Sequence, residues 1–271
     1  IIAILVFTAL ILGLVKYRRK GIARYVILAS VFITVAFVLL LPFWYLLVGL
    51  FPTGDLTQAG HLSTLLGFLS AALVTWILVK YPEWYVVDTV GLATAAGVTA
   101  ILGISFGILP ALLLLIALAF YDAWAVYHTK HMVTLADEIT SQRLPVLLVI
   151  PKHADYKFSE QKSLKEQVAK GEEREAMFIG LGDLIIPGIL AVSARVFLRD
   201  DIGTSVAGLP PSLLVALLTI IGSLVGFSIL MRFVLEGNPQ AGLPLLNGGA
   251  IAAFFLSVAL IYGTLIPPTV Q

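Results

Sequence analysis

Eight apolar segments close to the length of a membrane span constrain the fold of this 271-residue chain more than any other feature. A helical span needs about 20 apolar residues. Lipid offers backbone polar groups no partner, so only helices and closed barrels cross a membrane. A barrel would show alternating stretches of about ten residues, whereas the runs here are longer and do not alternate. The segments are residues 1–15, 25–50, 61–80, 84–103, 105–128, 176–197, 205–235 and 242–267.

The charge content agrees with a membrane protein, because only 12% of the residues are charged against about 25% in soluble domains. We therefore expect an all-α membrane protein, a polytopic helical bundle in the lipid bilayer. The net charge of +1 gives no case for a nucleic-acid partner, and the absence of cysteine excludes thiolate chemistry and a disulfide scaffold. The oligomeric state cannot be read from these features.

Lysine and arginine gather in two loops, residues 16–24 and the long polar stretch 129–175. With eight spans both loops lie on the same side, and the excess of positive charge predicts that this side is cytoplasmic. The predicted organisation is an N-terminal transmembrane bundle over 1–128, a cytoplasmic loop over 129–175 and a C-terminal transmembrane bundle over 176–271. We expect a multi-pass protein of the cell membrane.

Two aspartates lie inside membrane-length apolar segments. Asp122 follows Tyr121, and Asp183 closes the tetrad Gly180-Leu181-Gly182-Asp183. A charged residue at bilayer depth costs about 2.5–3.5 kcal/mol on insertion scales, so such residues usually have a function. Two carboxyls that share a proton can activate water and polarise a peptide carbonyl. The alternative for each residue alone is a structural or interfacial carboxylate.

A third stretch, Ala241-Gly242-Leu243-Pro244, begins the last apolar segment. Its Gly and Pro are expected to break helical hydrogen bonding and leave extended backbone, which a membrane protein tolerates only against protein or a cavity. The alternative is an ordinary loop that enters a helix.

These three stretches resemble the motifs of the presenilin and signal-peptide-peptidase family of intramembrane aspartyl proteases, and the compact loops are most similar to its archaeal presenilin homologues. Tyr121-Asp122 matches the family's Tyr-Asp pair, and residues 180–183 match its Gly-x-Gly-Asp motif. Ala241-Gly242-Leu243-Pro244 keeps only the Leu-Pro part of the third motif. The family has nine spans and eight are counted here; we expect the start of the chain to account for the difference.

The resemblance implies an aspartic endopeptidase of the GxGD type that cleaves transmembrane helices of membrane-protein substrates, in a water-accessible pocket open to the cytoplasm, without cofactor or metal. Asp122 and Asp183 would be catalytic. Tyr121, Gly180 and Gly182 would support the active site, with the glycines leaving room beside Asp183. The residues expected to bind substrate are Leu181, Ala241, Gly242, Leu243 and Pro244.

A proton- or cation-coupled transporter or channel is the alternative function, since membrane carboxylates also act as relays. The internal repeat typical of many transporters is not seen. A zinc protease would need His-Glu-x-x-His, which is absent, and His128 and His131 are interpreted as solvated residues at a span end. Asp88 is interpreted as an interfacial or structural carboxylate and Asp55 as a loop residue.

The run Pro145–Pro151 is short, β-prone and bracketed by prolines. An unwound substrate helix exposes backbone groups that are costly to leave unpaired, and addition to a strand edge would satisfy them. Pro145–Pro151 and the backbone at Ala241–Pro244 are the two predicted edges. The alternative is that Pro145–Pro151 only anchors the loop.

Overall fold

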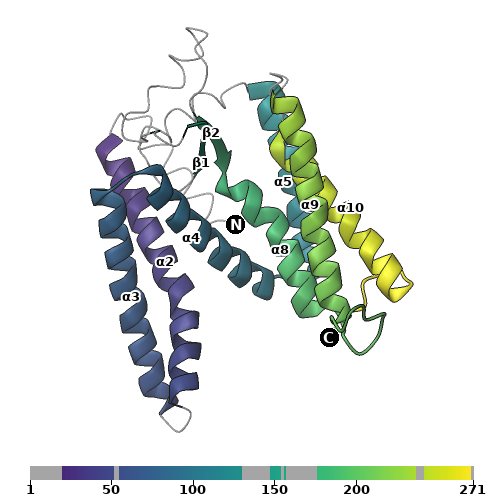
Figure 1. Cartoon of the computed structure of the whole chain (residues 1–271), viewed down its shortest axis with the longest axis horizontal. Helices are drawn as coiled ribbons and strands as arrows, with labels where there is room; N and C mark the ends of the chain where they lie inside the picture. The colour runs from purple at the N-terminus through teal and green to yellow at the C-terminus, as the bar shows by residue number, and fades with distance from the viewer. Residues whose placement is uncertain are drawn as a thin grey trace. The chain divides into compact units, whose positions relative to one another are not determined.

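The described part of the chain consists mainly of helices that follow the apolar segments (Figure 1). The computed structural model describes residues 20–51, 55–129, 147–153, 156, 176–235 and 241–269. Within these residues the helices are α2 (Lys20–Leu50), α3 (Leu56–Lys80), α4 (Trp84–Ser105), α5 (Ile108–Trp124), α8 (Leu181–Phe197), α9 (Pro211–Leu235) and α10 (Gly242–Tyr262). The fold is mostly helical, as predicted.

The described residues are not all helical in the α form, however. A one-turn π-helix, η1 (Ala125–Thr129), continues α5, and the strands β1 (Leu147–Pro151) and β2 (Ala176–Gly180) pair into a two-stranded sheet. The expectation of an all-α protein is corrected to this extent. The β-prone run before Pro151 does form a strand as its residues predict, with its first two positions outside the described residues.

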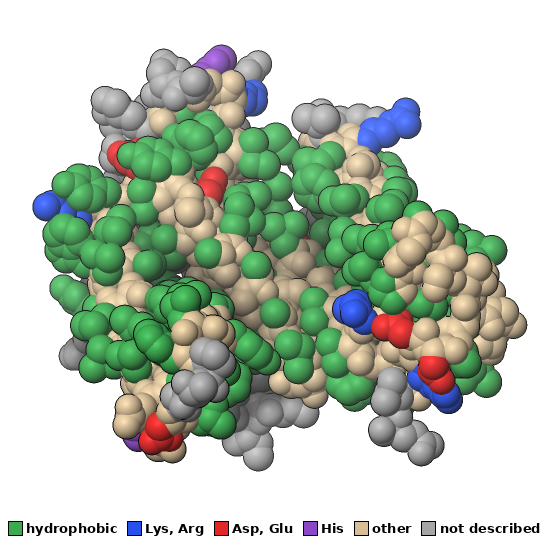
Figure 2. All heavy atoms as spheres, turned by 60° about the horizontal axis from the view of Figure 1, so that its bottom comes forward, with side chains coloured by type: hydrophobic (Ala, Val, Ile, Leu, Met, Phe, Trp, Pro, Cys, Tyr) green, Lys and Arg blue, Asp and Glu red, His purple; other side chains and the backbone are tan. Residues whose placement is uncertain are grey.

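Five helices in the described residues are long and apolar enough to cross a membrane. They lie in α2, α3, α4, α9 and α10. Helices α5 and α8 have 17 residues each, near the lower limit for a span, and the predicted segment 1–15 lies outside the described residues. The count of eight spans therefore stays a prediction. Figure 2 shows hydrophobic side chains over most of the surface in view, as a lipid-facing protein requires.

Three segment boundaries differ from the predicted ones, each for a local reason. Residues 176–180 form β2 before α8 begins, because they pair with β1. Helix α9 begins only at Pro211, which suits a first helical position because it needs no N–H partner. Helix α10 ends at Tyr262, where Gly263 adopts a left-handed conformation (φ 69°) that closes the helix.

The described residues form two compact units: residues up to 94 with 147–178, and residues 95–129 with 179–269. In the first unit α2 packs against α3 through Val35, Ala36 and Ala71. Asp55 is the N-cap of α3, since its carboxylate accepts the Thr57 N–H at 2.8 Å. Asp55, which was expected to be a loop residue, therefore stabilises the start of α3.

In the second unit α9 and α10 approach each other through glycine. A Cβ at Gly226 would lie 2.1 Å from the carbonyl oxygen of Leu245. A Cβ at Gly249 would lie 2.2 Å from the carbonyl oxygen of Gly222. Small residues allow such close contact between membrane helices, which lack a hydrophobic driving force for association. Gly222 and Gly226 form a Gly-x-x-x-Gly pair on α9 that the sequence analysis overlooked.

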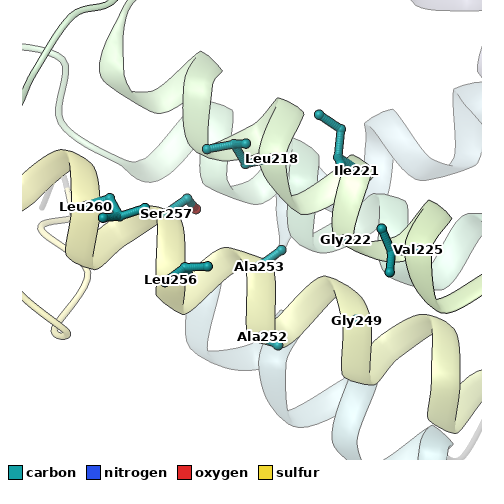
Figure 3. Close-up of a pocket in the computed structure, with 10 residues that line it drawn as sticks. All are labelled: Leu218, Ile221, Gly222, Val225, Gly249, Ala252, Ala253, Leu256, Ser257 and Leu260. Atoms are coloured by element: carbon teal, nitrogen blue, oxygen red, sulfur yellow. The ribbon is translucent and has the colours of Figure 1, made fainter.

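An apolar groove of about 410 Å³ follows this contact (Figure 3). Glycines and larger apolar side chains of both helices line it. The residues that line it are Leu218, Ile221, Gly222, Val225, Gly249, Ala252, Ala253, Leu256, Ser257 and Leu260.

Polar contacts join the far ends of α8, α9 and α10. Arg195, in the last turn of α8, donates to Asp200 at 3.0 Å and to the Ser212 hydroxyl of α9 at 2.7 Å. The Tyr262 hydroxyl of α10 donates to the carbonyl oxygen of Arg199 at 2.7 Å. Burial opposes ionisation of Asp200, but hydrogen bonds from Ser212 and the Arg195 ion pair outweigh it and lower the pKa of this carboxyl.

The adjacent glycines Gly248 and Gly249 of α10 should respond oppositely to alanine. Gly249→Ala forces a methyl group into the Gly222 backbone, so we expect a loss of about 1–3 kcal/mol of stability. Gly248→Ala meets nothing within 4 Å and should be neutral or gain up to about 1 kcal/mol from helix propensity. Thermal unfolding in detergent measures both. Equal melting temperatures for the two variants would contradict the close helix contact.

Candidate functional site

Asp122 lies in the last turn of α5, just before the π-turn η1. Its Oδ2 accepts the backbone N–H of Leu243 at 3.0 Å. Leu243 belongs to the first turn of α10, where N–H groups have no partner within the helix. Asp122 therefore caps α10 from another helix and fixes the position of its own carboxylate.

Asp183 lies in the first turn of α8, three residues after the end of β2. Gly180 is the N-cap of α8, with extended backbone (φ −64°, ψ 129°) and without a side chain to cap the helix. A carboxylate in the first turn is stabilised by the positive end of the helix dipole. The strand-to-helix junction thus places Asp183 at an electropositive backbone position.

The two carboxylates converge on the start of α10. A Cβ at Gly242 would lie 3.5 Å from Oδ2 of Asp183, and the N–H of the next residue, Leu243, binds Asp122. The carboxylates of Asp122 and Asp183 thus lie beside consecutive residues at the start of the same helix. Neighbouring like charges do not both ionise readily, so such a pair can hold one proton between its two members.

Glycine leaves space around Asp183. A Cβ at Gly180 would lie 3.5 Å from Oδ2 of Asp183, and the Cβ at Gly242 at the same distance. Gly182 is exposed, and a Cβ there would meet no atom within 4 Å. None of these three positions therefore places a side chain against the Asp183 carboxylate.

The other residues expected at the site lie in different surroundings. Tyr121 is 64% exposed, and its ring lies 6.5 Å from that of Trp124. The side chains of Leu181, Ala241 and Leu243 are buried. These three residues are therefore covered by other parts of the protein in this arrangement.

The stretch Ala241–Pro244 is not extended as expected. Only Ala241 has extended backbone (φ −69°, ψ 127°), and α10 begins at Gly242. Pro244 is tolerated there because the N–H that it lacks would have no partner within the first turn. This stretch is a helix start capped by Asp122, so the predicted second strand edge is wrong.

Sequence reasoning missed Asn247, one turn further along α10. Its side chain is fully buried and its Nδ2 donates to the carbonyl oxygen of Leu115 in α5 at 2.9 Å. This bond and the bond between Leu243 and Asp122 join α10 to α5 at two positions one helical turn apart. The sequence could have pointed to Asn247, because it is a single side-chain amide inside an apolar segment and polar residues in spans are usually paired.

The third carboxylate in an apolar segment, Asp88, belongs to the other unit. Its Oδ1 accepts the N–H of Val149 in β1 at 2.8 Å. Asp88 therefore makes a contact with a strand, which agrees with its interpretation as an interfacial or structural carboxylate. His128 is exposed, and its ring stacks on that of Trp124 at 6.1 Å.

Comparison with known proteins adds independent information. Residues 1–263 match the family model described as signal-peptide peptidase, presenilin aspartyl protease. A solved presenilin family intramembrane aspartate protease in a C222 crystal is 36% identical, with 95% of this chain and 83% of that chain covered and a TM-score of 0.57. A structure of the same description in a P2 crystal is 35% identical over 95% and 81% of the chains, with a TM-score of 0.60. No curated protein matches this chain significantly.

Proposed function

The chain belongs to the signal-peptide peptidase and presenilin family of intramembrane aspartyl proteases, and on this premise we propose that Asp122 and Asp183 are its catalytic pair. The convergence of both carboxylates on the first turn of α10 is the observation that carries this assignment. The transporter alternative finds no support in the family match or in the similar structures.

In the proposed reaction the ionised member of the pair removes a proton from water. The water oxygen attacks the scissile carbonyl carbon, and the protonated member gives its proton to the carbonyl oxygen. The tetrahedral gem-diol then collapses: the carboxyl that took the proton from water gives it to the leaving nitrogen as the C–N bond breaks, and a diol hydroxyl returns a proton to the other carboxylate. Each turnover consumes one water and produces a carboxyl and an amine. The pair returns to its singly protonated state.

The proposed substrates are transmembrane helices of other membrane proteins. A helix buries its peptide bonds in its own hydrogen bonds, so a segment must unwind before water can reach it. The glycines around Asp183 leave room for that segment. The small sheet formed by β1 and β2 offers strand edges that could pair with the exposed backbone groups.

We also propose that the loop over 129–175 and the opening of the catalytic pocket face the cytoplasm. The support is the gathering of Lys and Arg in this loop and in residues 16–24, since cytoplasmic loops carry the excess of positive charge.

The first prediction from the proposed function concerns the carboxylate pair. Asp122→Asn and Asp183→Asn should each reduce cleavage of a single-span substrate to background, because neither variant retains two carboxyls. The double variant should be no slower, since residues that act as a unit are not additive. Cleavage is measured on a fluorescent membrane-helix substrate in detergent or liposomes.

The melting temperature serves as the control that these variants are folded. The side-chain amide introduced by Asp122→Asn still offers an oxygen to the N–H of Leu243, so the melting temperature of this variant should stay near the wild-type value. A folded single variant with near-normal turnover would refute the catalytic assignment.

The second prediction concerns access to Asp183. Gly182→Leu places a side chain in open space one residue before Asp183 in the chain, so it should block substrate sterically while thermal stability is kept. Gly248→Leu is the matched control, because Gly248 is also an exposed helical glycine with nothing within 4 Å of its Cβ position. We expect the control to cleave at the wild-type rate. Normal cleavage by Gly182→Leu would contradict the close-approach argument.

The third prediction concerns orientation. The chain has no cysteine, so a single Ser163→Cys variant carries one reactive thiol in the long loop. A membrane-impermeant maleimide should label it in inside-out vesicles and not in intact cells. Labelling of intact cells would place the loop outside and reverse the proposed topology.

A further inference from the structure

Asp88 is a carboxylate in a membrane-length helix that the proposed reaction does not use. It lies in the second turn of α4, and its Oδ1 accepts the N–H of Val149 at 2.8 Å. Both residues belong to the same compact unit. The Asp88 oxygen supplies an acceptor for a backbone N–H of a buried strand residue, so this contact is well suited to hold the strand.

Val87 precedes Asp88 in α4 and packs in the same apolar cluster as the side chain of Val149. Val149 is 1% exposed and packs in one apolar cluster with Val87, Leu78 and Ala176 of β2. Two consecutive residues of α4 thus fix Val149, one through its side chain and the other through its backbone. Loss of Asp88 would leave a buried N–H without its acceptor, which proteins avoid.

The position of this bond within the strand is also informative. Successive strand residues direct their N–H and C=O groups to opposite edges of the strand. Because the N–H of Val149 binds Asp88, the groups of Leu148 and Ile150 point the other way, toward β2. Asp88 therefore supports the outer edge of β1, where no further strand is present among the described residues.

The sheet leads directly to the catalytic region along the chain. Strand β1 pairs with β2, and β2 ends at Gly180, three residues before Asp183.

We propose that Asp88 is a positioning residue for proteolysis: its bond to Val149 holds β1, and with it the sheet, in the arrangement that receives an unwound substrate segment. This inference rests on the proposed function. Asp88 acts as a hydrogen-bond acceptor in this role, so its oxygen matters and its charge does not.

Two substitutions separate the acceptor from the charge. Asp88→Leu removes the acceptor at similar size, whereas Asp88→Asn keeps an oxygen at the same position. Thr89→Val is the matched control, because Thr89 is exposed and its hydroxyl donates to the Tyr85 carbonyl of its own helix. Hydrogen exchange at the Val149 amide should become about tenfold faster in Asp88→Leu and stay near wild type in the other two variants.

Substrate handling is the second measurement. The KM for a single-span peptide should rise about tenfold in Asp88→Leu with kcat within about twofold, as expected when ground-state and transition-state binding are lost equally. The Kd of the same peptide, measured in an Asp122→Asn background that cannot turn over, should rise by the same factor. Asp88→Asn and Thr89→Val should keep wild-type values.

Several results would overturn the inference. Unchanged exchange at Val149 in Asp88→Leu would show that the bond does not hold the strand. Faster exchange with unchanged Kd and KM would show that the strand does not position substrate. If Asp88→Asn behaved like Asp88→Leu, the charge of Asp88 and not its oxygen would be what holds the strand. A loss confined to kcat would place Asp88 in the chemistry.

Failure of the proposed function itself has a different signature. In that case the wild type does not cleave, while exchange and peptide binding still test Asp88. Should Asp88→Leu not fold, Val149→Pro removes the donor instead, and faster exchange at the neighbouring amides with a tenfold weaker Kd is expected. Wild-type values for a folded Val149→Pro would refute the inference as well.

Discussion

The hydrogen bond between the Leu243 N–H and the carboxylate of Asp122 is the contact on which the site depends. A helix that begins inside an apolar environment must find acceptors for its first N–H groups within the protein. Helix α10 finds one on α5, so the need to cap a helix places a carboxylate beside Gly242. Asp183 then approaches the same glycine from α8, and the pair is formed by three helix ends.

The rest of the second unit keeps these helix ends in place. Asn247 binds the carbonyl oxygen of Leu115 and fixes α10 against α5 one turn beyond the cap. Glycine contacts at Gly222 and Gly226 bring the middle of α9 to backbone distance from α10. The contacts of Arg195 and Tyr262 join the opposite ends of the same helices. A carboxylate pair at one end is thus supported by packing in the middle and polar bonds at the other end.

Local patterns were sufficient to find much of this arrangement. Tyr121-Asp122 and Gly180-Leu181-Gly182-Asp183 identified the two carboxylates, because a charge in an apolar segment is rarely without a function. The prolines and β-branched residues before Pro151 identified β1. The same reasoning failed at Ala241–Pro244, where Gly and Pro suggested broken backbone. A helix start tolerates both residues when a distant side chain supplies the cap.

The sequence by itself determined that the chain is a mostly helical membrane protein and that Asp122 and Asp183 are its exceptional residues, because hydropathy and motif spacing depend only on neighbours along the chain. Only the tertiary structure decided which groups those residues meet. Asp122 and Leu243 are 121 positions apart, and Asp88 and Val149 are 61 apart. A hydrogen bond over such separations depends on how helices pack in space, which no local pattern encodes.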